Sequence, residues 1–228
     1  MEVIMKQVGV FAVFLDALRA PSIQVLVFGT GFLLCMLFVY MGVLTPMDNN
    51  LYALLSEVGN AAPWRQALLQ DATVLGSLSV LLFVTVSVAM ALLLAGEQRK
   101  ALTFVCAVVI GLAVTFLLQA GIARPRPPLA DHTATLYDHS FPSTHTTLST
   151  LVYFYIAYLL NHFTKNRAVR LWVYLVAAIL VMTIGISKVM LGMHWPSDVV
   201  AGWCAGGSMA ALSFYVIKWK RKLRVKTS

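Results

Sequence analysis

Long runs of apolar residues constrain this chain more than any other feature of its sequence. Six runs stand out, and each is near the roughly 20 residues that a helix needs to cross a bilayer. Backbone groups inside lipid must form their hydrogen bonds within the segment, so runs of this length predict helices rather than strands. The predicted segments are residues 23–45, 73–95, 101–120, 144–161, 171–190 and 198–217.

The composition supports a membrane protein. Of the 228 residues, 60% are hydrophobic and 11% are charged, whereas about a quarter of the residues of a soluble domain are charged. The predicted fold class is all-α: a polytopic membrane helical bundle with six transmembrane helices. We expect one domain over residues 1–228, because the connections between the apolar runs are too short to fold alone.

The N-terminus carries apolar residues at helical spacing. Asp16 and Arg19 interrupt the apolar stretch and no clear cleavage site follows, which argues against a cleaved signal peptide. We expect an N-terminal interfacial helix over residues 1–20, with a frayed terminus as the alternative. The apolar face of this helix is formed by Phe11, Phe14, Leu15 and Leu18.

Basic residues predict the orientation in the membrane. They concentrate in the turns after the second and fourth segments and in the C-terminal tail, which by the positive-inside rule are cytoplasmic. The N-terminus is then cytoplasmic too, and the net charge of +8 reflects anionic headgroups rather than nucleic acid. The residues are Arg99, Lys100, Lys165, Arg167, Arg170, Lys218, Lys220, Arg221, Lys222, Arg224 and Lys226.

The loops after the first, third and fifth segments then face outward. The first of these is roughly neutral and predicts a short amphipathic helix on the outer surface, since Leu51, Leu54, Leu55 and Val58 recur at helical spacing. The second begins with two cations that violate the charge rule, which indicates that a site on that side needs positive charge. These cations are Arg124 and Arg126.

Three outward helix ends carry polar residues that topology does not explain, in residues 119–127, 141–145 and 187–198. If these ends meet, two histidines, a carboxylate and several cations share one site. Arginine and lysine supply donors for phosphate oxygens, and a helix that starts after Pro142 offers free backbone N–H groups to an anion. Ser143 is the expected N-cap.

The histidines suit phosphoryl transfer. A neutral histidine attacks phosphorus, and a second, protonated one donates a proton to the leaving oxygen. Asp198 follows His194 by four residues, so a helical turn brings its carboxylate to the imidazole, where it fixes the tautomer.

These stretches resemble the signature motifs of the type 2 phosphatidic acid phosphatase family, K-x6-R-P, P-S-G-H and S-R-x5-H-x3-D. Here they read Gln119-x6-Arg126-Pro127, Pro142-Ser143-Thr144-His145 and Ser187-Lys188-x5-His194-x3-Asp198. The resemblance implies six transmembrane helices, no metal or other cofactor, a lipid phosphate substrate, a phosphohistidine on His194 and His145 as general acid. It also implies a phosphate cradle, to which we assign Gln119, Arg124, Arg126, Ser143, Thr144, Ser187 and Lys188.

The chain departs from the family pattern at three positions. Gln119 stands where lysine is usual, Lys188 where arginine is usual and Thr144 where glycine is usual. The first change removes a full charge from the cradle, for which Arg124 is a candidate substitute, and the second loses the bidentate fork of arginine.

The sequence therefore predicts a lipid phosphate or diphosphate phosphatase in a bacterial inner membrane, with its active site on the periplasmic face. The resemblance favours an isoprenoid diphosphate or phosphatidylglycerophosphate as substrate. One alternative is a phosphatase or phosphotransferase acting on a lipid A-type glycolipid, and another is a non-catalytic lipid-phosphate binder or transporter. Four loop residues are expected to be solvated, and these are Asp131, His132, Asp138 and His139.

Overall fold

A computed structural model describes residues 20–128, 139–161 and 163–227 of the chain. The interfacial helix predicted near the N-terminus and the loop residues Asp131, His132 and Asp138 lie outside the described residues. The described part is helical, apart from turns, short extended segments and an isolated antiparallel bridge between Pro125 and His139. Its helices are α2 (Pro21–Tyr40), α3 (Thr45–Asn60), α4 (Pro63–Val74), α5 (Leu78–Leu94), α6 (Gln98–Ile122), α7 (Thr144–Leu160), α8 (Arg167–Met190) and α9 (Pro196–Thr227).

The helix ends follow local sequence signals. Proline opens α2, α3, α4 and α9, where its missing N–H has no helical partner to lose. The side chains of Ser77 and Asn166 cap α5 and α8 by accepting hydrogen bonds from Val80 N and Ala168 N. At its other end, α6 stops at Ala123, whose φ of 50° turns the chain into an extended segment.

Five helical stretches in the described part are long and apolar enough to cross a membrane. The polytopic all-α membrane bundle is therefore confirmed. The predicted segment 144–161 forms α7, which has 17 residues and a polar first turn, so by length it falls short of the other five. The five stretches are Pro21–Tyr40, Pro63–Leu94, Gln98–Ile122, Arg167–Met190 and Pro196–Ile217.

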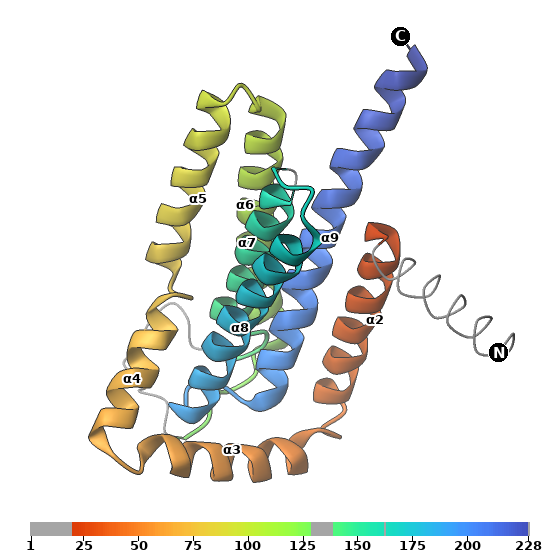
Figure 1. Cartoon of the computed structure of the whole chain (residues 1–228). Helices are drawn as coiled ribbons and strands as arrows, with labels where there is room; N and C mark the ends of the chain where they lie inside the picture. Colours follow the sequence, from red (N-terminus) through yellow and green to blue (C-terminus); the bar gives the residue numbers. More distant parts are fainter. Residues whose placement is uncertain (1–19, 129–138, 162, 228) are drawn as a thin grey trace, which may run out of the picture.

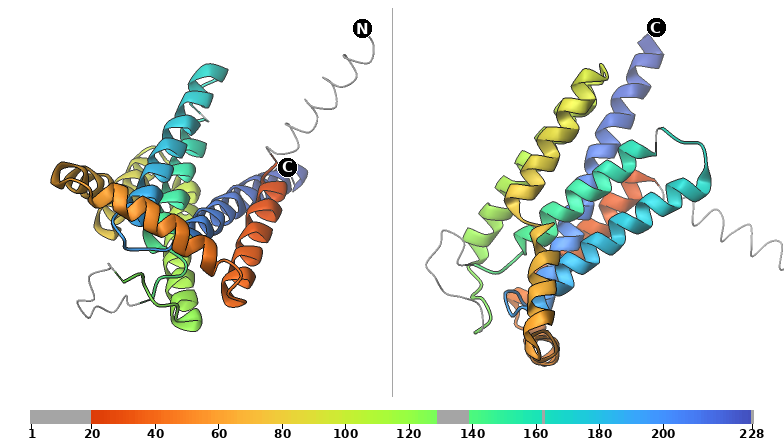
Figure 2. Two further views of the ribbon diagram at one scale, coloured as in Figure 1. Left: turned by 90° about the horizontal axis from the view of Figure 1, so that it is seen from below. Right: turned by 60° about the vertical axis from the view of Figure 1, so that its left-hand side comes forward.

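The bundle is built around α7 and α9. Helix α7 packs against α6, α8 and α9, while α2 lies along α9 and α5 pairs with α6 (Figures 1 and 2). Helix α3 runs across one end of the bundle, and α4 leads from it to α5 (Figure 1). The turn between α5 and α6 and the end of α9 lie at the opposite end.

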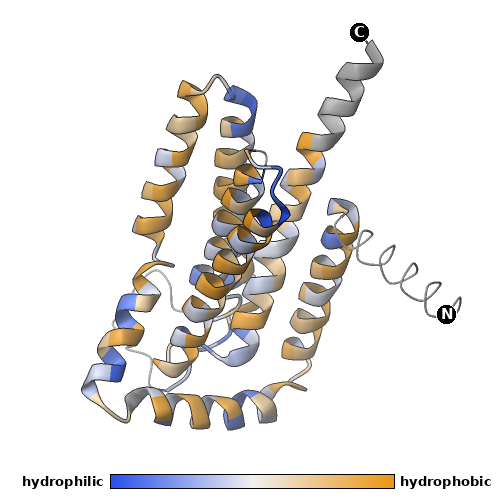
Figure 3. Cartoon of the chain, viewed as in Figure 1, coloured by the Kyte–Doolittle hydropathy of each residue, from blue (hydrophilic) through white to orange (hydrophobic). Residues whose placement is uncertain are grey.

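The buried core lies between the helices, and apolar residues also lie on their outer faces, so most of each helix is orange in Figure 3. Phe104, Leu151 and Tyr155 are fully buried in the core, whereas Phe83 and Leu117 are among many large apolar side chains that are mostly exposed. An apolar exterior of this kind matches lipid rather than water.

The two central helices approach closely along a stripe of glycine on α9. A Cβ atom on Gly206 would lie 2.3 Å from the Thr147 carbonyl oxygen, and one on Gly202 would lie 2.8 Å from the Thr146 Cβ. Only glycine allows this spacing, which fixes the start of α7 against the start of α9.

The amphipathic segment in the first outward loop is confirmed as a helix, α3. Leu51, Leu54 and Val58 form an exposed apolar stripe along it. A second face of the helix carries Asp48 and Ser56, which are buried against the bundle. Polar residues thus attach α3 to the protein, and its apolar stripe is free to contact lipid.

Candidate active site

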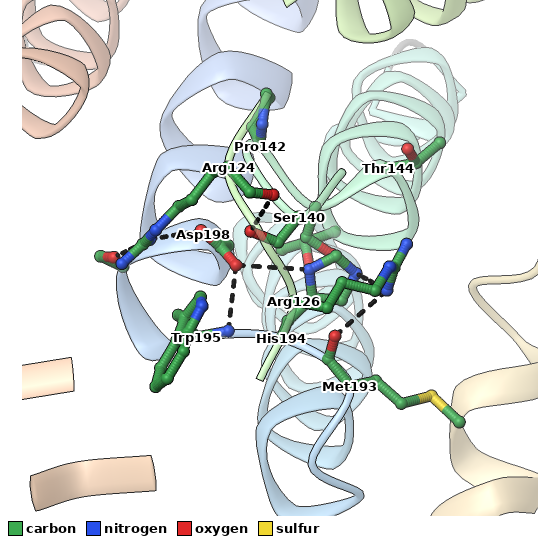
Figure 4. A network of polar contacts seen from close by, with 12 residues as sticks. Arg124, Arg126, Ser140, Pro142, Thr144, Met193, His194, Trp195 and Asp198 are labelled. Carbon is green, nitrogen blue, oxygen red and sulfur yellow. Dashed lines mark hydrogen bonds and ion pairs between the residues drawn. The ribbon is translucent and has the colours of Figure 1, made fainter. Parts of the chain in front are cut away.

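The three sequence stretches that carry polar residues meet at the α3 end of the bundle (Figure 4). The chain after α6 contributes two arginines, the start of α7 contributes a histidine, the end of α8 contributes a lysine, and the α8–α9 connection contributes His194. The backbone N–H of Ser143 donates to the Asp198 carbonyl oxygen at 3.1 Å, which joins the starts of α7 and α9.

His194 lies at the centre of this group with 2% of its surface exposed. Its Nε2 is 3.4 Å from Nη1 of Arg126, and its Nδ1 is 3.5 Å from Oδ2 of Asp198 (Figure 4). A guanidinium only donates hydrogen bonds, so Nε2 acts as the acceptor and the ring proton is on Nδ1, facing the carboxylate. That tautomer places the imidazole lone pair on Nε2, which can attack once Arg126 turns its N–H from Nε2 to a substrate anion.

Burial sets the charge state of His194. Burial removes solvent from the imidazole and lowers its pKa, and the positive charges of Arg126 and Lys188 lower it further. Asp198 raises the pKa but does not offset burial, so the pKa is below its usual value. The ring is therefore neutral near pH 7, as a nucleophile must be. At 3.5 Å the Nδ1 lacks a hydrogen-bond partner among the described residues, and contacts of this kind commonly shorten when a substrate binds.

Asp198 is fully buried in the first turn of α9. Its Oδ2 accepts a hydrogen bond from Trp195 N at 3.0 Å, and its Oδ1 accepts one from Nη1 of Arg124 at 2.5 Å. The spacing of four residues from His194 thus places carboxylate and imidazole side by side, as the sequence predicts.

The two arginines after α6 point to different places. Arg126 faces His194 and donates to the Met193 carbonyl oxygen at 3.1 Å. Arg124 lies on the other side of Asp198, where its guanidinium is bound to carboxylates and stacks over the Trp195 ring. The structure therefore brings Arg126 to Nε2 of His194, whereas Arg124 is engaged on the far side of Asp198.

The start of α7 contributes His145, which lies within electrostatic range of His194, Lys188 and Arg126. Ser143 occupies the N-cap position as predicted, yet its hydroxyl makes no capping hydrogen bond. Instead it accepts a hydrogen bond from the Thr146 hydroxyl at 3.0 Å.

The two α8 residues of the predicted cradle, Lys188 and Ser187, differ in whether they can donate to a phosphate. Lys188 is buried, and its Nζ donates to the Met193 thioether sulfur at 3.5 Å. Because a thioether is a weak acceptor, this ammonium is readily redirected to an anion. The Ser187 hydroxyl donates to the Ile184 carbonyl oxygen within its own helix at 2.8 Å.

Two departures from the family pattern contact each other. The side-chain amide of Gln119 donates to the Pro142 carbonyl oxygen and to the Thr144 hydroxyl, both at 2.9 Å. Both amide hydrogens are used in these contacts, so Gln119 supports the turn that starts α7 and has no donor left for phosphate.

The sequence did not indicate Asp48, which is one of the charges of the roughly neutral first outward loop. In the structure Asp48 is fully buried and ion-paired to Arg124. Its position in the first turn of a helix opened by Thr45 and Pro46 was the available signal, because an acidic residue is favoured there. Nothing local to the sequence indicated its partner.

Replacing Gln119 with leucine is expected to lower the free energy of unfolding by about 1–3 kcal/mol, since it leaves a buried carbonyl oxygen and hydroxyl without their donor. Thermal unfolding of the detergent-purified protein measures this loss. Gln98→Leu, an exposed position at the other end of the same helix, is the control. Equal unfolding midpoints for the two variants would contradict the role of Gln119 as a support of this turn.

A profile of the PAP2 superfamily matches residues 100–222, which contain all the sequence-predicted site residues. Phosphatidylglycerophosphatase B of Bacillus subtilis (strain 168) is 29% identical over 159 residues, covering 68% of this chain and 75% of that protein. Bacitracin transport permease protein BcrC of Bacillus licheniformis is 38% identical over 78 residues, 34% of each chain.

Two solved structures share the fold. A transmembrane PAP2-type phosphatidylglycerolphosphate phosphatase from Bacillus subtilis superposes with a TM-score of 0.77 at 23% identity, covering 86% of this chain and 96% of that one. Aquifex aeolicus LpxE gives a TM-score of 0.54 at 22% identity, with 74% and 95% covered. The predicted family is confirmed: the chain belongs to the PAP2 (type 2 phosphatidic acid phosphatase) superfamily and is an integral membrane phosphatase.

Proposed function

We propose that the protein hydrolyses a phosphate ester or diphosphate of a membrane lipid through a phosphohistidine on His194. One observation carries this proposal: the buried imidazole has Asp198 behind Nδ1 and Arg126 beside Nε2. An activated nucleophile next to a cation, at the end of an apolar bundle, fits a charged headgroup on a lipid tail.

In the first step, Nε2 attacks phosphorus and a P–N bond forms while the P–O bond to the lipid breaks. The leaving oxygen takes a proton from His145, and Asp198 stabilises the positive charge that develops on the imidazole. In the second step, water attacks the phosphohistidine, His145 accepts a proton from that water, and inorganic phosphate leaves. Arg126, Lys188 and the free N–H groups at the start of α7 stabilise the phosphate oxygens in both steps.

For the substrate, we favour phosphatidylglycerophosphate or an isoprenoid diphosphate such as undecaprenyl diphosphate. The name of the Bacillus subtilis relative supports the first, and the matched region covers 68% of this chain. The second rests on the resemblance of the sequence motifs, because the name of the Bacillus licheniformis relative mentions no lipid and the match covers a third of this chain. A lipid A-type glycolipid is the alternative, and the altered first motif, with Gln119 in place of lysine, is its support.

The charge distribution supports an outward-facing site. The first turns of α6 and α8 carry Arg99, Lys100, Arg167 and Arg170. Both helices run from there toward the end of the bundle that α3 crosses (Figure 1), and hydrophilic positions mark their starts in Figure 3. We propose that α7 crosses with the other five spans and that both termini are cytoplasmic, which places the site on the periplasmic face.

A panel of lipid phosphates tests the substrate. Purified protein should release phosphate from at least one of phosphatidylglycerophosphate, undecaprenyl diphosphate and a lipid A phosphate. Vanadate should inhibit and EDTA should not, because vanadate mimics pentacoordinate phosphorus and the mechanism uses no metal. In inverted membrane vesicles, impermeant vanadate should inhibit only after detergent opens them. Strong inhibition by EDTA would contradict the mechanism, and inhibition of sealed inverted vesicles would contradict the orientation.

A further inference from the structure

Asp48 is a buried carboxylate far in sequence from the other site residues and outside the region matched by the family profile. Its Oδ1 accepts a hydrogen bond from Ser197 N at 2.9 Å, and its Oδ2 accepts one from the Ser197 hydroxyl at 2.6 Å. These bonds connect α3 to the first turn of α9, directly beside Asp198. A buried charge with this many partners is held in a defined place.

Arg124 lies between two carboxylates. Its Nη2 is 2.7 Å from Oδ2 of Asp48, and its Nη1 is 2.5 Å from Oδ1 of Asp198. Nη1 also donates to the Ser197 hydroxyl at 2.8 Å. The guanidinium is only slightly exposed, so water screens these contacts weakly. One terminal nitrogen of the arginine is thus used by Asp48, and the other by Asp198 and Ser197.

The charges of Asp48, Arg124 and Asp198 together determine the electrostatic field at the His194 imidazole. A guanidinium paired with Asp198 alone would form a neutral unit and cancel most of the field that the carboxylate exerts on the imidazole. With Asp48 on the other side of Arg124, two carboxylates share one cation, and one net negative charge remains next to Nδ1.

This negative charge offsets the positive charges that surround His194. His194 faces Arg126 from the chain after α6, Lys188 from α8 and His145 from α7, and Asp198 from α9 is the carboxylate beside it. Asp48 reaches this group from α3 through Arg124. The basicity of the imidazole therefore depends on how much of the charge of Asp198 remains uncompensated.

We infer that Asp48 is a positioning residue for the proposed reaction, which holds Arg124 and preserves the negative charge that Asp198 presents to His194. The kinetic effect of this inference rests on the proposed function. The effect of Asp48 on the titration of His194 does not, because it exists whether or not the protein hydrolyses a substrate. Asp48 itself does not touch the reacting atoms.

The kinetic test is Asp48→Asn. Loss of one negative charge lowers the pKa of His194, so the acid limb of the pH profile of kcat/KM should move to lower pH by roughly one unit. A less basic imidazole is a weaker nucleophile, so kcat should fall by about threefold to tenfold, tenfold being the full effect of one pKa unit, while KM stays unchanged. Glu57→Gln, an exposed carboxylate on the same helix, should behave as wild type.

A charge-matched double variant separates electrostatics from packing. Asp48→Asn with Arg124→Gln removes one carboxylate and one cation, so the net charge beside His194 returns to its original value. The acid limb should therefore return close to its wild-type position. If Asp48→Asn does not fold, Arg124→Gln alone should shift the limb the opposite way, to higher pH, because two carboxylates then lack their cation.

A second readout requires no substrate. The chain contains five histidines, so nitrogen-15 spectra of histidine-labelled protein, with His194→Ala to assign the signals, report the titration of His194. Asp48→Asn should lower its midpoint by roughly one pH unit. The double variant should restore it. An unchanged midpoint in Asp48→Asn, or a double variant shifted as far as the single one, would overturn the inference. If the midpoint shifts but wild type hydrolyses no lipid phosphate, the proposed function fails and the charge relationship stands.

Discussion

His194→Ala is expected to abolish phosphate release from every lipid phosphate that the wild-type protein hydrolyses. In the proposed mechanism Nε2 of His194 is the nucleophile, with Asp198 beside Nδ1 and Arg126 beside Nε2, and the covalent intermediate cannot form without it. Removal of a catalytic nucleophile lowers kcat by about a thousandfold or more. Phosphate release in detergent, measured against His162→Ala as a control in the chain between α7 and α8, gives the ratio.

The same variant separates an enzyme from a binder. Wild-type protein mixed briefly with a phosphorus-labelled lipid should carry an acid-labile, alkali-stable label, as expected for phosphohistidine, and His194→Ala should carry none. A lipid-phosphate binder or transporter would retain the lipid without releasing phosphate in either form. Equal rates of release from His194→Ala and wild type would show that the assigned nucleophile is wrong.

Of the substitutions proposed here, Gly206→Val should cause the largest loss of stability. Its Cβ would lie 2.3 Å from the Thr147 carbonyl oxygen and 2.7 Å from the Thr150 Cβ, both on α7. The α7 backbone cannot move aside as a flexible side chain can, so α7 and α9 must separate. The free energy of unfolding should fall by about 3 kcal/mol or more. Because these helices carry His145 and Asp198, activity should fall together with the unfolding midpoint in detergent.

Gly121→Ala is the matched control for this prediction. Nothing in the described structure lies within 4 Å of a Cβ at Gly121, and this glycine is also in a helix. Alanine favours helix over glycine by roughly 1 kcal/mol, so the control should be neutral or slightly stabilising. A Gly206→Val protein that unfolds at the wild-type temperature would contradict the close approach of α7 and α9.

The helices were predictable because lipid imposes a length and a composition on them. The ends of the helices were harder to predict. The first predicted segment ran to residue 45, whereas α2 ends at Tyr40 and the chain turns through Gly42 with a φ of 72°. The residues around that turn are as apolar as the helix, so hydropathy does not detect it. Hydropathy likewise does not show that the central helix α7 is shorter than the spans around it.

The sequence predicted best those parts of the site that depend on spacing along one element. His194 and Asp198 meet because four residues make one helical turn. The partner of Gln119 lies 25 residues away and that of Asp48 lies 149 residues away, and no local pattern encodes such contacts. The sequence therefore indicated the cations of the site without showing that Arg124 binds carboxylates.

The extended chain after α6 assigns two different tasks to two identical side chains. Pro125 pairs with His139 in a short bridge, and Arg124 and Arg126 flank it, with Arg124 directed to Asp198 and Arg126 to His194 (Figure 4). In a regular strand, side chains two residues apart lie on the same face, so the spacing of the two arginines does not by itself separate them. Their tasks are separated by the groups that bind each guanidinium: two carboxylates for Arg124, and the His194 ring with the Met193 carbonyl oxygen for Arg126. Counting arginines in a related sequence therefore gives less information than identifying the partner of each one.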